Sequence, residues 1–312
     1  MLKRIRITGI ERETPAVIVG CMRQAGFTAD PFSPGRMNRF IHTALENGAN
    51  YFDHADIYGM GRAERVFGEA VASDSTIKRE DLIIQSKCSL SDGCFDSSEK
   101  YILGAVDGIL SRLRTEYLDV LLLHRPDALI EPEEVAAAFS KLEKSGKVRH
   151  FGVSNFKPMQ IELLKKCVEQ PIAVNQLQLS LVHSGMIAAG IEANMTTEDA
   201  CDRDGGVLDY CRMKDITIQA WSPLQAGRRE GSFIGNENYP ELNRLLGELA
   251  EKYGSTPAGI AAAWIMRHPA DIQVVAGTGD EGRLVDIIKA SDITLSRREW
   301  YSLYLAAGHF LP

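Results

Sequence analysis

The chain has 312 residues, of which 45% are hydrophobic and 25% charged, a composition typical of globular proteins. Its formal net charge is -7, and Lys and Arg form no run longer than a pair, so we expect neither nucleic acid nor a membrane as a partner. The six cysteines never form C-x-x-C pairs, and the N-terminus lacks the apolar region of a signal peptide. These features indicate reduced thiols and predict a cytoplasmic protein.

Eight short runs rich in β-branched and apolar residues predict strands. They span residues 16–22, 51–55, 81–87, 119–124, 150–154, 172–178, 217–223 and 272–278. Segments with helical spacing lie between them, and in the first of these Ser33 and Pro34 stand where a helix begins and Gly48 where it ends. Two further amphipathic segments, 239–254 and 296–308, predict extra helices before the eighth strand and at the C-terminus.

This alternation predicts the fold class. Eight strands with their helices in 312 residues fit an α/β fold of the (β/α)8 TIM-barrel type better than two doubly wound domains. Because no Pro- or Ser-rich linker and no low-complexity segment divides the chain, we expect one domain over residues 1–312. Barrel enzymes place their reacting groups where the strands end.

Four polar residues follow successive predicted strands. Asp53 ends the second strand, with Tyr58 just beyond it, while Lys87 ends the third strand and His124 the fourth. A phenol, with its reference pKa of about 10, holds a proton at neutral pH, and a nearby ammonium stabilises the phenolate that remains after donation. A carboxylate keeps that ammonium charged, and an imidazole can orient a carbonyl oxygen. The set predicts a carbonyl reductase whose hydride comes from a cofactor, because no side chain supplies one.

Seven stretches carry a resemblance to a known family. DHADIYG, IIQSK, LLLHRPD, GKVRHFGVSNF, NQLQLS, AWSPL and AGTGDEGRL follow one another in order, and together they resemble the aldo-keto reductases, in particular a bacterial oxidoreductase subgroup. The resemblance implies a monomeric or weakly oligomeric barrel that binds NADPH and reduces a small-molecule aldehyde or ketone. It also implies that Tyr58 is the general acid, that Lys87 and Asp53 tune it, and that His124 orients the carbonyl.

The resemblance further implies a set of nicotinamide-binding residues. Those expected to contact the carboxamide are Ser154, Asn155 and Gln176. Trp221 takes the place of the ring that stacks on the nicotinamide, followed by Ser222 and Leu224 along the pyrophosphate. Ser and Asn before a helix are also good N-cap residues, so capping stays an alternative for Ser154 and Asn155.

The run GTGDEG, residues 277–282, matches the G-x-G-x-x-G pattern of dinucleotide-binding folds. Only about thirty residues follow it, too few for the further βα units of such a fold, whereas barrels often bind phosphate after strands seven and eight. We therefore expect Gly277, Thr278 and Gly279 to bind the cofactor within a barrel.

The residues after this run bear on the choice of cofactor. Arg283 matches a family arginine that can grip phosphate or stack on adenine, and Asp286 matches the acidic position near the adenine amine. Gly279 and Asp280 stand where many members have Lys or Arg, and Ile287 where they usually have Asn. NADPH is favoured, and NADH remains the alternative.

Several other features receive structural or substrate-binding interpretations. Strand alternation predicts that His54 points away from the Asp53 face toward the helices, and Asp56 is expected to brace the loop. The run GMGRAE, residues 59–64, predicts a turn into a helix. Met22 and His183 are candidates for the substrate pocket, and we expect specificity from loops 23–33, 179–206 and 225–240.

Other functions use the same residues differently. Lys87 could be the Schiff-base nucleophile of an aldolase, but a charged lysine beside Asp53 argues against it. A hydrolase metal could be drawn from Asp53, His54 and His124, but His54 faces the wrong side, so we expect no metal. A cofactor-binding regulatory or redox-sensing module with little turnover, like the barrel used as an ion-channel subunit, stays the main alternative.

Overall fold

The computed structural model describes residues 2–25, 32–91, 93–227 and 230–312. Residues 26–31 and 228–229, which belong to two of the predicted specificity loops, lie outside the described residues. The third such loop, 179–206, is described and contains a short helix, α6 (Gly185–Ile191), so it is less irregular than its polar sequence indicates.

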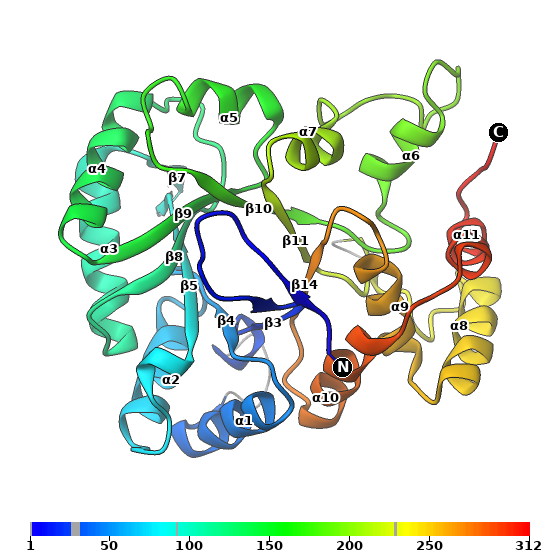
Figure 1. Cartoon of the computed structure of the whole chain (residues 1–312), viewed down its shortest axis with the longest axis horizontal. Coiled ribbons are helices and arrows are strands. Elements are labelled where there is room, and N and C mark those ends of the chain that lie inside the picture. Colours follow the sequence, from blue (N-terminus) through cyan, green and yellow to red (C-terminus); the bar gives the residue numbers. More distant parts are fainter. Residues whose placement is uncertain (1, 26–31, 92, 228–229) are drawn as a thin grey trace.

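Eight parallel strands close into a barrel, which confirms the predicted fold class (Figure 1). In chain order they are β3 (Val17–Gly20), β4 (Tyr51–Asp53), β5 (Ile83–Cys88), β8 (Leu118–Leu123), β9 (Val148–Ser154), β10 (Ile172–Gln178), β11 (Thr217–Trp221) and β14 (Gln273–Ala276). Neighbours along the chain are neighbours in the barrel, and β14 pairs with β3 to close it. Each predicted strand is present, although those predicted at 16–22, 51–55, 217–223 and 272–278 are at least two residues shorter than expected.

Helices surround the barrel. They are α1 (Pro34–Glu46), α2 (Arg62–Ala72), α3 (Glu99–Leu113), α4 (Pro132–Lys144), α5 (Pro158–Leu164), α6, α7 (Val207–Met213), α8 (Pro240–Tyr253), α9 (Pro257–Met266), α10 (Glu281–Lys289) and α11 (Arg297–Ala306), with 3₁₀ turns at Arg23–Ala25, Arg79–Asp81 and Ala290–Asp292. Ser33 caps α1 as expected, but Asn47 occupies the C-cap and Gly48 follows it with φ +82°. The predicted C-terminal end of this helix, at Gly48, is therefore one residue later than the observed C-cap.

The two extra helices pack outside the barrel's own ring. Helix α8 packs on α9, and α11 packs on α8, at the right of Figure 1. Trp264 of α9 stacks on Trp300 of α11 with ring centroids 4.8 Å apart. Each indole N–H donates to the other residue's carbonyl at 3.0 Å, so both buried donors are satisfied. The extra helices predicted from the sequence thus contribute buried side chains to the hydrophobic core.

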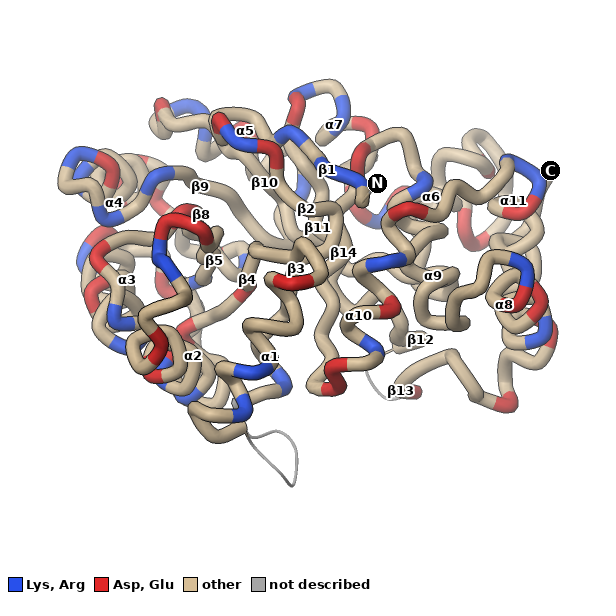
Figure 2. The backbone as a smooth tube through the Cα atoms, turned by 60° about the horizontal axis from the view of Figure 1, so that its bottom comes forward, with Lys and Arg blue, Asp and Glu red and all other residues tan. Residues whose placement is uncertain are grey.

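The two ends of the barrel differ. A hairpin of β1 (Arg4–Ile5) and β2 (Thr14–Pro15) lies across the end where the strands begin (Figure 1). Two hairpins follow strands at the other end, β6 (Leu90–Ser91) with β7 (Cys94–Phe95), and β12 (Gln225–Gly227) with β13 (Gly231–Ser232). Figure 2 shows β1 and β2 far from β12 and β13. The β1–β2 hairpin covers the end where the strands begin, which is called the closed end below. The predicted site residues lie at the other end, where the strands finish.

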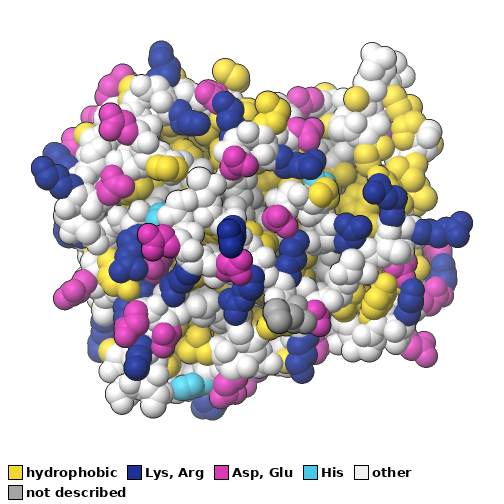
Figure 3. All heavy atoms as spheres, viewed as in Figure 1, with side chains coloured by type: hydrophobic (Ala, Val, Ile, Leu, Met, Phe, Trp, Pro, Cys, Tyr) yellow, Lys and Arg dark blue, Asp and Glu magenta, His cyan; other side chains and the backbone are white. Residues whose placement is uncertain are grey.

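Positive and negative side chains are interspersed over the face shown in Figure 3, in agreement with the absence of basic runs in the sequence. Within the described residues, no helix combines the length and apolar character needed to cross a bilayer. The six cysteines are all free thiols, and three of them, Cys21, Cys88 and Cys211, are buried.

Two glycines give a matched test of helix packing. A Cβ on Gly68 of α2 would lie 2.5 Å from the Arg112 carbonyl oxygen at the end of α3, whereas a Cβ on Gly247 of α8 would meet nothing within 4 Å. Gly68→Ala should lower the free energy of unfolding by about 1–3 kcal/mol through overpacking, and Gly247→Ala should raise it by about 0.5–1 kcal/mol. Urea unfolding measures both, and equal effects would contradict the close approach of α2 to α3.

Candidate active site

A buried ion pair lies where β4 and β5 end. Lys87 Nζ is 2.7 Å from Asp53 Oδ2, and the residues are 0% and 2% exposed. Lys87 Nζ also donates to the His54 carbonyl at 2.8 Å and to the Tyr58 hydroxyl at 3.1 Å. Burial alone would lower the pKa of Lys87, but Asp53 and Tyr58 raise it above its ordinary value. Lys87 is therefore a fixed ammonium in contact with Tyr58.

Tyr58 and His124 lie beside this pair, with ring centroids 5.9 Å apart in an edge-to-face arrangement. Burial raises the pKa of Tyr58, and Lys87 offsets this only in part, so the phenol keeps its proton at neutral pH. Burial, together with Lys87 and Arg125, lowers the pKa of His124 well below its ordinary value. The structure thus brings together the four residues predicted as the catalytic set.

His54 points away from this set, as strand alternation predicts. Its ring packs 4.6 Å from Phe67 of α2, and neither ring nitrogen has a hydrogen-bond partner among the described residues. Burial lowers the pKa of His54 to about 3, so the ring is neutral.

Asp56 lines a separate cavity of about 660 Å³ between the β4–α2 loop, the β6–β7 hairpin and α3. Burial, followed by the charge of Glu64, raises the pKa of Asp56 to about 7.

Three residues predicted to face the nicotinamide are joined to one another. Asn155 Nδ2 donates to Ser154 Oγ at 2.8 Å, and Trp221 Nε1 donates to Asn155 Oδ1 at 3.1 Å. Ser154 Oγ in turn donates to the Gln176 carbonyl at 2.9 Å. Helix α5 has Lys157 as its N-cap, so the alternative that Ser154 and Asn155 cap this helix is wrong.

The backbone is unusual at the same strand ends. Asn155, after β9, has φ +63°, and Ser222, after β11, has φ +53°. Ser89, one residue past β5, has φ +87° and was not singled out from the sequence. Non-glycine residues in the left-handed region are uncommon and cluster at functional sites. Leu224, two residues after Ser222, is partly buried against the hydrophobic core.

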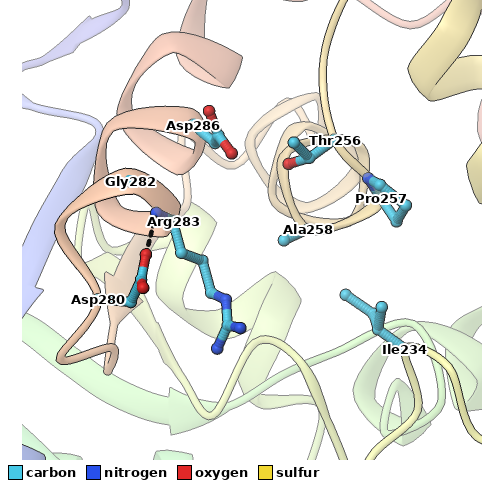
Figure 4. Close-up of a pocket in the computed structure, with 8 residues that line it drawn as sticks. All are labelled: Ile234, Thr256, Pro257, Ala258, Asp280, Gly282, Arg283 and Asp286. Atoms are coloured by element: carbon cyan, nitrogen blue, oxygen red, sulfur yellow. Dashed lines mark hydrogen bonds between the residues drawn. The ribbon is translucent and has the colours of Figure 1, made fainter.

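The predicted adenosine residues lie around a cavity of about 370 Å³ between α9, α10 and the segment after β13 (Figure 4). It is lined by Ile234, Thr256, Pro257, Ala258, Asp280, Gly282, Arg283 and Asp286. Gly277, Thr278 and Gly279 form the loop from β14 into α10. The Thr278 carbonyl accepts from Gln24 Nε2 at 3.0 Å, which fixes this loop against the segment after β3.

Asp280 has a structural task at this cavity. Its Oδ1 accepts from the Arg283 backbone N–H at 2.7 Å, so its carboxylate caps α10 (Figure 4). From the sequence Asp280 is only a departure from the family pattern. Ile234 belongs to the predicted specificity loop 225–240, whereas Thr256, the N-cap of α9, was not singled out because no motif marks this helix start.

The Schiff-base alternative loses support at this geometry. A Schiff-base lysine has to be neutral, whereas Lys87 is held charged by a carboxylate at 2.7 Å. No group of three or more His, Cys, Asp or Glu side chains in the described part of the chain is arranged to hold a metal ion. Met22 and His183 are both exposed, after β3 and β10, and their roles stay predictions.

The fold and the site lead to one family. The model of the aldo/keto reductase family matches residues 16–304, so the chain belongs to that family. Oxidoreductase YdhF of Escherichia coli is 32% identical over 100% of both chains, which confirms the bacterial subgroup indicated by the motifs. A 6-dehydroglucose reductase of Novosphingobium aromaticivorans is 31% identical over 90% of this chain and 88% of its own. An aldo-keto reductase from Klebsiella pneumoniae, solved in complex with NADPH, has a TM-score of 0.76 at 25% identity, covering 97% of this chain and 94% of that one.

Proposed function

We propose that the protein is an NAD(P)H-dependent carbonyl reductase that converts an aldehyde or ketone to an alcohol. The observation that carries this proposal is the position of Lys87 Nζ, 2.7 Å from Asp53 Oδ2 and 3.1 Å from the Tyr58 hydroxyl. A protonated phenol in contact with a buried ammonium is arranged to give up its proton to a developing alkoxide and to be stabilised as a phenolate afterwards. This arrangement of Tyr58, Lys87 and Asp53 favours an enzyme over a regulatory module.

The residues divide the chemistry between them. A carbonyl oxygen that gains negative charge during reduction would take the hydroxyl proton of Tyr58. The ammonium of Lys87 then faces the phenolate, and Asp53 keeps that ammonium from losing its own proton. His124, neutral because burial lowers its pKa, can donate one hydrogen bond to the same oxygen and set its direction.

The proposed cofactor is NADP, and when bound it supplies the hydride. The donor set fits it at both ends. Trp221 offers a ring at the barrel mouth. Both Nε2 hydrogens of Gln176 are engaged, with Asp53 and Gln219, so its Oε1 is the amide atom left for a carboxamide N–H. Arg283 and Asp286 line the cavity beside α10, where an adenosine phosphate would meet a cation and the adenine amine an acid.

The Klebsiella relative in complex with NADPH supports this cofactor, and the name of the Novosphingobium relative points to a sugar aldehyde among the substrates to be tried. We further infer one functional domain over residues 1–312, acting as a monomer or weak homo-oligomer. The substrate class that we propose is a small carbonyl compound.

Tyr58→Phe should abolish most turnover while leaving cofactor binding intact, because it removes only the transferable proton. The expected loss in the rate of NADPH oxidation with a panel of aldehydes, ketones, quinones and sugar aldehydes is at least about 100-fold. NADPH affinity, measured by fluorescence titration, should stay within about twofold of wild type. Tyr253→Phe, which removes a hydroxyl bonded to Glu299 on the outer helices, is the control and should keep full activity. Undiminished reduction by Tyr58→Phe would exclude this mechanism.

Asp280→Asn should favour NADPH over NADH more strongly than wild type does. Asparagine keeps the N-cap bond to the Arg283 N–H but removes a negative charge from the wall of the cavity. Only NADPH carries the 2′-phosphate that this charge repels, so its Kd should fall about three- to fivefold at low salt while that of NADH is unchanged. An equal change for the two nucleotides would place the 2′-phosphate elsewhere.

A further inference from the structure

The interior of the barrel carries amides where a core usually carries apolar side chains. Four buried glutamines, Gln85, Gln176, Gln219 and Gln273, come from β5, β10, β11 and β14. Register partners in a sheet point to the same face. Gln219 is the register partner of both Gln176 and Gln273, and Gln85 is the partner of Asp53. The strand register therefore assembles these amides into one layer below the ion pair.

The hydrogen bonds of this layer run in one direction. Gln273 Nε2 donates to the Pro15 carbonyl at 2.7 Å and to Thr14 Oγ at 3.1 Å, in the hairpin at the closed end. A carbonyl only accepts, so the amide of Gln273 has one orientation and presents its Oε1 to Gln219. Gln219 Nε2 donates to that oxygen at 3.1 Å and to the Tyr51 hydroxyl at 3.3 Å.

The direction continues to the catalytic carboxylate. Gln219 Oε1 accepts from Gln85 Nε2 at 2.9 Å and from Gln176 Nε2 at 3.1 Å. The second hydrogen of each amide goes to Asp53 Oδ1, at 2.6 Å from Gln85 and 3.1 Å from Gln176. Tyr51 completes the set by donating to Gln85 Oε1 at 2.8 Å. All eight N–H hydrogens of the four amides are engaged, and none can be reversed without facing two acceptors toward each other.

We propose that these glutamines and Tyr51 form a positioning network that fixes the orientation of the Asp53 carboxylate toward Lys87. The inference rests on the proposed function, since the importance of Asp53 derives from its hold on the Lys87 ammonium. Gln85 and Gln176 are the direct positioning residues, and Gln219 orients them both. Lys87 occupies Oδ2 and the two amides occupy Oδ1, so hydrogen-bond donors hold both oxygens of the carboxylate in place.

Gln85→Met tests the network, with Gln273→Met as the matched control. Methionine is close to glutamine in volume and removes the amide. Gln273 is equally buried and belongs to the same layer, but it has no bond to Asp53. Both variants are expected to lose stability, and their dependence on pH separates them.

The first measurement is the unfolding free energy from about pH 3 to about pH 7, a range that includes the ordinary carboxyl pKa of about 3.9, and it needs no enzymatic activity. The loss caused by Gln85→Met should shrink as the pH falls, because the missing bond was made to an ionised carboxylate, whereas the loss caused by Gln273→Met should be the same at each pH. The second is the pH–rate profile of carbonyl reduction. Its acid limb should move to higher pH by about one to two units in Gln85→Met only, since a hydrogen bond to a charged group is lost.

Equal pH dependence of stability in the two variants would overturn the network while leaving the reductase function untouched. A wild-type protein that oxidises no NADPH with any carbonyl would instead sink the proposed function, with the stability measurement still deciding on the network. Should Gln85→Met not fold, Gln85→Glu keeps the shape and sets a second carboxyl against Asp53. In Gln85→Glu the acid limb of the pH–rate profile should also move to higher pH, and the loss of stability should also shrink as the pH falls, as expected for Gln85→Met.

Discussion

The site depends on keeping one ammonium charged where water is excluded. Lys87 is fully buried, and a buried lysine without a partner loses its proton. Asp53 at 2.7 Å prevents this, but burying two charges costs free energy that only good geometry and further hydrogen bonds offset. The donors around Asp53 supply those bonds. In the proposed mechanism Tyr58 can then act as an acid, because the cation that stabilises its phenolate is already in place.

The barrel meets this requirement through strand alternation. Tyr51 and Asp53 share the inner face of β4, as Gln85 and Lys87 share that of β5, because alternate residues of a strand point to the same side. The strands that carry the reacting groups thus also carry the groups that support them, one layer deeper. The His54 ring falls on the other face and packs against α2, so the contact of this residue with Lys87 is made by its backbone carbonyl.

The local patterns were enough to predict the barrel. They also predicted Asp53, Tyr58, Lys87 and His124, which the structure places close together, because each stands at or just beyond the end of a strand whose apolar run is visible in the sequence. The glutamine layer was not predicted, because its bonds depend on the register between strands distant in the chain, which no single run encodes. The cavity beside α10 needed Ile234 and Thr256, which a loop and a helix start bring there. The helix cap at Lys157 was missed because Ser154 and Asn155 are the better cap residues, yet the strand continues through Ser154.

The identity of the proton donor is the central claim, and Tyr58 and His124 differ in how pH affects them. Burial raises the pKa of Tyr58 and lowers that of His124, so between about pH 6 and about pH 9 the first stays protonated and the second stays neutral. The direct measurement is the single-turnover rate of NADPH oxidation by the wild-type protein with a saturating aldehyde across that range. The rate should be constant and fall only at more alkaline pH. A rate that falls as the pH rises through about 6.5 would contradict donation by Tyr58 and assign the proton to a cationic His124.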